Sequence, residues 1–249
     1  MNTLPKVAIP SYMRADIISN LTLKYLYDQN YPTFLIRIFV ASDEERFRYA
    51  AAIPRHLYSE IVVGVPGLAA QRNFISNFYP EGEIIMQLDD DVKGLKILYP
   101  GIAFLDLVRE GCRAIYEQGA GLWGVMPNDD GRKMQARTTR HLTHILGSFF
   151  ICRNHRDIVI TTTDKEDFER SILYFRRYGS VCRFQGAGVI TRYDNMPGGL
   201  QTADRRQRMK ADMEYLVLNY PEYVKTVVKK KGLDITLNWR APALDPVGL

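Results

Sequence analysis

Three adjacent carboxylates, Asp89, Asp90 and Asp91, are the strongest chemical signal in this 249-residue sequence. They directly follow the apolar residues 84–88, which predict a buried strand that ends at the aspartates. Adjacent carboxylates repel one another unless a cation lies among them. Because successive side chains of an extended segment point in opposite directions, Asp89 and Asp91 are expected to face the same way. The pattern favours a site for a hard divalent cation, Mg²⁺ or Mn²⁺, and a solvated acidic turn is the alternative.

The elements that must position these aspartates alternate between strands and helices. Apolar runs predict strands at residues 6–10, 34–41, 61–65 and 84–88, and helices are expected at 17–27, from residue 43 onward and at 68–78. Strands that are apolar throughout and separated by helices indicate a parallel sheet covered on both faces. In such sheets, ligands bind at the carboxyl ends of the strands. Those ends carry Ser11-Tyr12, Ala41-Ser42, Pro66-Gly67 and the aspartates, so we expect one functional edge.

The second half of the sequence has a less regular pattern. It predicts helices at residues 104–117, 164–177, 203–220 and 221–231, and strands at 122–126, 145–152 and 158–161. The last helix would begin with a proline in its first turn. The predicted fold class is therefore α/β, with a mostly parallel sheet, flanking helices and a helical C-terminal part.

The order of these motifs resembles that of glycosyltransferases with the GT-A fold. The resemblance rests on Ile9-Pro10-Ser11-Tyr12, then Gln71-Arg72-Asn73 on a helix, then Gly82-Glu83 leading through a strand into the aspartates. It implies one GT-A (Rossmann-like) catalytic domain over residues 1–249. Residues 1–95 would form the nucleotide-sugar-binding half and residues 96–249 the acceptor-binding half.

The resemblance also implies roles for individual residues. Asp89 and Asp91 would hold a Mn²⁺ or Mg²⁺ ion that bridges the diphosphate of the donor, which we expect to be a UDP-sugar. The remaining residues expected to bind the nucleotide-sugar are Pro10, Ser11, Tyr12, Arg14, Gln71, Arg72 and Asp90. The position of Arg72 near a helix N-terminus, which favours anions, agrees with this role. The alternatives are a surface ion pair for Arg72 and a packing role for Tyr12.

A second acidic segment, Thr163 to Asp167, lies where a helix is expected to begin. An acceptor hydroxyl is a poor nucleophile, so a carboxylate must take its proton as the sugar is attacked. In the inverting enzymes that this sequence resembles, an acidic pair in this part of the chain supplies that base. Asp167 is therefore expected to be the base, with Glu166 beside it. The alternative is a capping box in which these acids stabilise the helix start.

A narrower resemblance concerns the acceptor. The segments IPSYMRADII and KEDFERS, and the loop GGLQ before a basic helix, resemble the TET/JBP-associated glycosyltransferases of phages and kinetoplastids. Those enzymes act on hydroxymethylated pyrimidines in DNA, so the resemblance implies DNA as a partner. The residues expected to contact the acceptor are Gly198, Gly199, Gln201, Arg205, Arg206 and Arg208. A basic helix face that is merely solvated is the alternative.

Composition limits the remaining possibilities. The net charge of +5 favours an anionic partner, and three widely spaced cysteines outside any C-x-x-C pair indicate reduced thiols. With no signal-peptide pattern and no long apolar run, the chain is expected to be cytoplasmic, in the host cytoplasm if phage-encoded, with no membrane partner. A glycan, lipid or protein acceptor stays open. A nucleotidyltransferase is disfavoured because the loop from Ser11 to Arg14 lacks glycine, and a non-enzymatic nucleic-acid-binding module leaves the aspartates unexplained.

Overall fold

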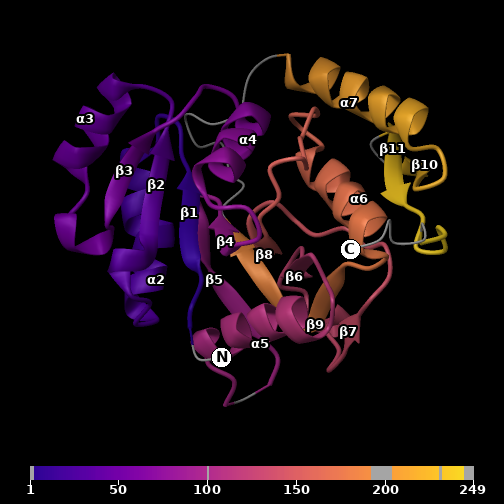
Figure 1. Ribbon diagram of the computed structural model, residues 1–249, viewed down its shortest axis with the longest axis horizontal. Helices are drawn as coiled ribbons and strands as arrows, with labels where there is room; N and C mark the ends of the chain where they lie inside the picture. Colours follow the sequence, from indigo (N-terminus) through magenta and orange to yellow (C-terminus); the bar gives the residue numbers. More distant parts are fainter. Residues whose placement is uncertain (1–2, 100, 192–203, 230–231, 244–249) are drawn as a thin grey trace.

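The computed structural model describes residues 3–99, 101–191, 204–229 and 232–243 (Figure 1). The strands are β1 (Lys6–Pro10), β2 (Ile36–Val40), β3 (Glu60–Val63), β4 (Ile84–Leu88), β5 (Val92–Ile97), β6 (Leu122–Met126), β7 (Thr138–Thr139), β8 (Phe149–Arg153), β9 (Cys182–Thr191), β10 (Val224–Lys229) and β11 (Gly232–Leu237). The α-helices are α1 (Ala15–Ile18), α2 (Lys24–Asp28), α3 (Asp43–Ala52), α4 (Leu68–Phe78), α5 (Phe104–Glu117), α6 (Glu166–Tyr178) and α7 (Arg205–Asn219). A π-helix, Ser19–Leu23, joins α1 to α2, and 3-10 turns occupy Thr33–Leu35, Arg55–Leu57 and Gly131–Lys133.

A nine-stranded sheet in the order β3-β2-β1-β4-β8-β6-β9-β5, with β7 paired to β9, forms the centre of the protein. The first four strands are parallel, as expected, and the register places Ile9 beside Ile38 and Val7 beside Met86. Strand β8 then runs antiparallel to both β4 and β6. In Figure 1 the parallel strands lie to the left with α2 and α3, and α7 with the β10–β11 hairpin lies at the upper right.

Alternation along the strands builds two apolar cores. Val7 and Ile9 of β1 enter one core, together with residues of α2, α3 and α5. Ala8, between them, enters the other, together with residues of α4, α6, α7 and the hairpin. Successive side chains of a strand point to opposite faces, so both faces of the sheet are covered. All five residues of β4 are buried, and the strand ends directly before Asp89.

Two strand predictions in the second half need correction. The strand expected at 145–152 begins only at Phe149, because residues 145–148 form the loop whose Ser148 carbonyl accepts the Asp89 amide at 3.1 Å. No strand forms at 158–161. The Ile160 backbone is bound instead by the side chain of Asn73, and the Thr161 amide by Glu169. Side chains thus supply the hydrogen bonds that a neighbouring strand would give.

The helix expected at 221–231 is also wrong, because β10 pairs antiparallel with β11. The segment from Val224 to Val228 is rich in β-branched residues, which favour strands. Gly232 opens β11 with φ of 116°, a backbone conformation that suits glycine. The sequence also did not predict β5, β7, β9 and β11.

Candidate active site

A cavity of about 440 Å³ opens at the carboxyl ends of the parallel strands. It is lined by Pro10, Ser11, Tyr12, Arg14, Ala41, Val65, Pro66, Gly67, Leu68, Gln71, Asp89, Asp90, Asp91 and Arg205. The structure therefore brings together, at the expected edge of the sheet, most of the residues that the sequence assigned to the donor and the metal. Arg72 does not line the cavity, and Arg205 joins it from the C-terminal helix.

Asp90 is the most enclosed of the three aspartates, with 5% of its surface exposed. Ser11 Oγ donates to one carboxylate oxygen at 2.7 Å, and Arg14 Nη1 donates to the other at 3.0 Å. Tyr49, at 2.7 Å from Ser11 Oγ, accepts the Arg14 amide at 2.9 Å. Burial raises the pKa of Asp90, although Arg14 and Ser11 favour its charged form. Asp90 thus anchors the loop after β1 to the end of β4.

Asp91 is the aspartate with the strongest electrostatic case for a cation. Burial, and then the nearby charges of Asp89 and Asp90, raise its pKa to about 7. Its carboxylate lies 3.8 Å from Arg14 Nη1, and Asp89 beside it keeps 34% of its side chain exposed. An oxygen-donor set of this kind fits a hard divalent ion, which would relieve the repulsion among the carboxylates.

The three carboxylates are not drawn into one cluster. Among the described residues, the group whose possible ligand atoms all lie within 4.8 Å of one another is Glu81, His155 and Asp157, and it lies at the amino end of β4. The aspartate run differs because Asp90 turns toward Arg14 and Asp89 toward Arg72.

Arg72 lies in α4 with 4% of its surface exposed, and it contacts the aspartate run from the protein interior. Its guanidinium donates to Asp89 Oδ1 at 2.7 Å, to Gln87 Oε1 at 2.8 Å and to the Gly147 carbonyl at 3.0 Å. The residue before it, Gln71, accepts the Val65 amide at 2.8 Å and so holds the loop that forms the cavity wall. The contact of Arg72 with the donor stays a prediction. In the structure Arg72 contacts Asp89.

The acidic pair at the start of α6 has two different environments. Glu166 is buried in an ion pair with Arg170, and burial raises its pKa. Burial also disfavours ionised Asp167, but His144, with Nε2 at 2.7 Å from Oδ2, holds the pKa of Asp167 below its usual value. The imidazole also stacks on Phe168, with ring centroids 4.3 Å apart. The pair lies outside the cavity lining.

A short chain of contacts joins this pair to the aspartate run. Arg72, which binds Asp89, lies 4.0 Å from Glu166 Oε1. The Gly147 carbonyl bound by Arg72 belongs to a glycine where an added Cβ would lie 2.3 Å from Glu166 Oε1. The guanidinium of Arg72 therefore lies between Glu166 and Asp89.

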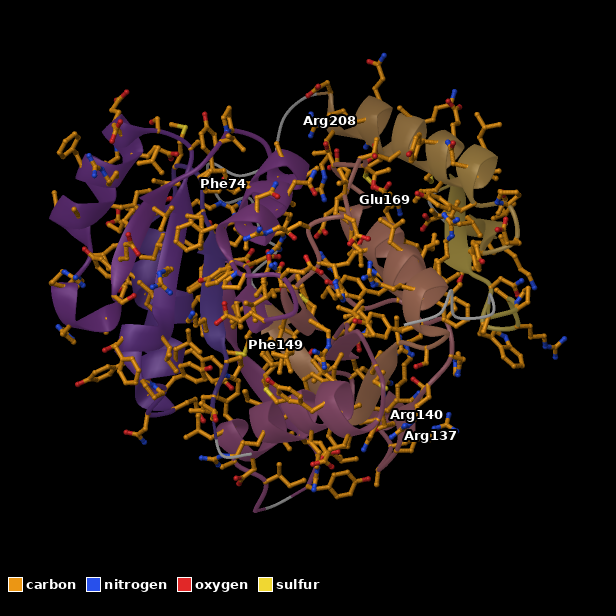
Figure 2. All side chains as sticks on the ribbon, viewed as in Figure 1. Phe74, Arg137, Arg140, Phe149, Glu169 and Arg208 are labelled. Atoms are coloured by element: carbon orange, nitrogen blue, oxygen red, sulfur yellow. The ribbon has the colours of Figure 1, made fainter. Side chains whose placement is uncertain are left out.

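The capping box is not the device that stabilises the start of α6. The backbone amides of Thr163, Asp164 and Lys165 all donate to one oxygen of Asp212, from α7, at 2.6–3.1 Å. In Figure 2, Arg208 lies at the amino end of α7, and Glu169 lies below it near the start of α6. The helix start is thus held by a residue from a distant element.

The predicted acceptor residues have different outcomes. Gly198, Gly199 and Gln201 lie outside the described residues. Arg206 is exposed at the surface of α7. Arg205 and Arg208 both bind the buried carboxylate of Asp164, so part of their hydrogen-bonding capacity is used within the protein.

Sequence reasoning missed several residues that shape the site. Glu45, which is 5% exposed, accepts the Met13 amide at 2.6 Å and the Ala41 amide at 2.9 Å, joining the loops after β1 and β2. His144 and Asp212 were likewise not assigned to the acidic pair and its loop. A buried acid in the first turn of α3 resembles an ordinary helix-start residue in sequence, so only long-range contacts reveal its role.

None of the helices in the described part of the chain combines the length and apolar character needed to cross a membrane.

Neither a protein-family model nor a curated protein matches this sequence. Solved structures do share its fold at low identity. GalNAc-T7, solved with UDP, GalNAc and Mn²⁺, gives a TM-score of 0.56 at 11% identity over 89% of this chain and 50% of its own. A mycobacterial protein gives 0.53 at 12% identity over 96% and 83%. Mannosyl-3-phosphoglycerate synthase from Rubrobacter xylanophilus gives 0.51 at 13% identity over 94% and 84%.

These likenesses concern the fold. They confirm the expected GT-A (Rossmann-like) α/β architecture with a large central sheet and flanking helices. This chain spans half the length of the GalNAc-T7 chain.

Proposed function

We propose that this protein is a glycosyltransferase that uses a nucleotide-sugar donor and a divalent cation. The observation that carries the proposal is the cavity at the carboxyl ends of the strands, which Asp89, Asp90 and Asp91 all line. Its volume of about 440 Å³ is that of a typical small-ligand site. GalNAc-T7, which shares the fold, is described with UDP, GalNAc and Mn²⁺, and this supports a donor of the same class.

Within this proposal, the residues divide the work by position. Asp89 and Asp91 would hold the cation, Mn²⁺ or Mg²⁺, which would supply positive charge to the diphosphate side of the donor. The loop of Pro10, Ser11 and Tyr12 receives the base and ribose, and Asp90 keeps that loop in place through Ser11. This role for Asp90 is an indirect one, since its carboxylate is already bound by Ser11 and Arg14.

We assign proton transfer to Asp167 in an inverting reaction. The acceptor hydroxyl loses its proton to the carboxylate, its oxygen bonds to the anomeric carbon, and the diphosphate leaves with the electron pair of the broken bond. His144, 2.7 Å away, orients that carboxylate. Its effect on the pKa of Asp167 favours the ionised form, which is the form that accepts the proton.

For the acceptor we propose the hydroxymethyl group of a modified pyrimidine in DNA. Support comes from the resemblance carried by IPSYMRADII, KEDFERS and GGLQ, and from the net charge of +5. The comparisons name no such acceptor. A glycan, lipid or protein hydroxyl is the competing choice.

A donor screen tests the proposal. The protein is incubated with UDP- and GDP-sugars, Mn²⁺ and hydroxymethylated DNA, and the nucleosides are then examined by mass spectrometry. We expect a sugar mass on the modified nucleoside and loss of transfer in chelator. The proposed activity is excluded if no donor is consumed, either with an acceptor or by slow hydrolysis, at any Mn²⁺ concentration.

A further inference from the structure

Arg205 is the residue through which the C-terminal helix reaches the donor cavity. It is the first residue of α7, and it lines the cavity together with the three aspartates. Building on the proposed function, we propose that Arg205 binds the diphosphate of the nucleotide-sugar and that Asp164 positions it there. The sequence had placed Arg205 among residues that contact DNA, and the cavity gives it a different substrate.

The first support is the enclosed carboxylate that holds the guanidinium. The Asp164 side chain has no exposed surface. Arg205 Nε donates to Oδ1 at 3.2 Å, and Arg208 Nε donates to Oδ2 at 2.9 Å. One buried negative charge therefore lies between two positive charges. A carboxylate that binds the Nε edge restricts the rotation of the guanidinium, which orients the arginine in the cavity wall.

The second support is the rigidity of the segment that carries Asp164. Asp212 accepts the amides of Thr163, Asp164 and Lys165 on one carboxylate oxygen. Lys165 then reaches the hairpin, where its Nζ lies 3.0 Å from Asp234. The loop before α6 is therefore held to both α7 and the hairpin, which fixes the Asp164 carboxylate that binds Arg205.

The third support is the distribution of charge around the cavity. Arg14, the second cation among the described lining residues, contacts Asp90 at 3.0 Å and lies 3.8 Å from Asp91, so it lies on the aspartate side of the cavity. Arg205 belongs to another element, and the acid that holds it lies outside the cavity lining. A guanidinium suits a diphosphate because its fork of N–H donors matches two phosphate oxygens. The amino end of the 15-residue α7 adds a favourable dipole for an anion.

Isothermal titration of the 249-residue protein with UDP or GDP, each with Mn²⁺, tests the assignment, with uridine and guanosine as probes that lack phosphate. We expect Arg205→Ala to weaken binding of the diphosphate about 10- to 100-fold and to leave nucleoside binding within about twofold. Arg205→Lys keeps the positive charge but lacks the forked N–H donors, so its affinity for the diphosphate should lie between those of the wild type and Arg205→Ala. Lys210→Ala removes the same charge from an exposed site on α7 and serves as the matched control.

Asp164 is tested as a positioning residue through a double-mutant cycle. Asp164→Asn alone should weaken binding of the diphosphate, and adding it to Arg205→Ala should cause little further loss. Circular dichroism and thermal melts show whether each variant is folded. If Arg205→Ala does not fold, Arg205→Lys is used in its place.

Three outcomes overturn the proposal. If Arg205→Ala binds the diphosphate at wild-type strength, Arg205 does not belong to the diphosphate site. The same follows if the variant loses affinity equally for nucleoside and diphosphate. Neither result contradicts a nucleotide-sugar donor. Failure of the wild-type protein to bind any nucleoside diphosphate removes both this assignment and the proposed function.

Discussion

Arg72 Nη2 lies 2.7 Å from Asp89 Oδ1 and donates also to the Gly147 carbonyl at 3.0 Å, so one buried nitrogen joins β4 to the loop that precedes β8. The same guanidinium lies 4.0 Å from Glu166. A single arginine therefore stands between the aspartate run and the acidic pair, and its charge offsets two carboxylates that would otherwise repel each other.

Replacing Arg72 should consequently destabilise the protein as well as the site. Arg72→Ala leaves the buried Gln87 Oε1 and Gly147 carbonyl without their donor, and the expected loss in free energy of unfolding is about 1–3 kcal/mol, the usual cost of an unpaired buried acceptor. Denaturant unfolding measures it. Arg48→Ala, which removes an exposed arginine paired with Glu44 on α3, is the control and should cause little change. Equal stability of both variants would contradict the structural role of Arg72.

Asparagine substitutions in the aspartate run should expose the cation requirement. Asp91→Asn and Asp89→Asn each remove a ligand charge, so Mn²⁺-dependent binding of the nucleoside diphosphate should weaken about 10- to 100-fold, as changes around metal ligands do. Titration with and without chelator measures this. Asp106→Asn, an exposed acid paired with Arg109 on α5, is the control. A metal-dependent donor site is ruled out if both variants bind the nucleoside diphosphate as strongly as the wild type and if chelator weakens none of the three proteins.

Local sequence patterns were sufficient for the elements that carry these aspartates. The predicted bounds of β4, α4, α5 and β6 coincide with those observed, because each is a clear apolar or amphipathic run with its own end signals. Residues 158–161 contain a similar apolar run, but Asn73 and Glu169 take the hydrogen bonds that a strand would make. Such a substitution depends on tertiary contacts, which no local pattern contains.

The same limit applies to the site. The sequence placed the aspartates and the loop after β1 at one edge, because the rule for parallel sheets needs only the order of strands. It did not place Arg205 in the cavity, since the ion pair with Asp164 spans 41 positions in the chain. Nor did it identify Asp212 as the acceptor for the start of α6, because Thr163 and Asp164 supply a plausible local cap.

Substitution of Asp167 should separate chemistry from binding. If Asp167 is the base, Asp167→Asn lowers turnover by about 10²–10⁴ while donor affinity changes little, because the lost interaction belongs to the transition state. Single-turnover kinetics and titration with the donor give the two quantities.

Glu169 provides the contrasting variant. Its carboxylate accepts the Thr161 amide at 2.8 Å and the Thr162 amide at 2.7 Å, so Glu169→Gln should lower the melting temperature with near-normal turnover of the folded fraction. If Asp167→Asn shows that same combination, Asp167 is a structural acid and another base must be sought.

The identity of the acceptor remains to be tested, and Arg206 is the residue whose substitution changes DNA contact alone. Arg205 and Arg208 bind Asp164, so changing them alters the protein interior, whereas Arg206 is exposed on α7. If Arg206 contacts DNA, Arg206→Ala should reduce the slope of log affinity against log salt by about 0.9, the value for one duplex phosphate. Hydrolysis of the donor without acceptor should be unchanged.

Binding alone does not identify the acceptor, because any basic protein binds DNA to some degree. The decisive property is the hydroxyl, which unmodified cytosine and uracil lack. We expect transfer to oligonucleotides containing hydroxymethylpyrimidine and none to matched unmodified ones, with faster reaction on single-stranded or mismatched sites because extruding the base costs less there. Mass spectrometry of the digested nucleosides measures both. Equal transfer to modified and unmodified DNA, or none to either beside strong transfer to a glycan, would exclude the DNA acceptor and leave the donor site intact.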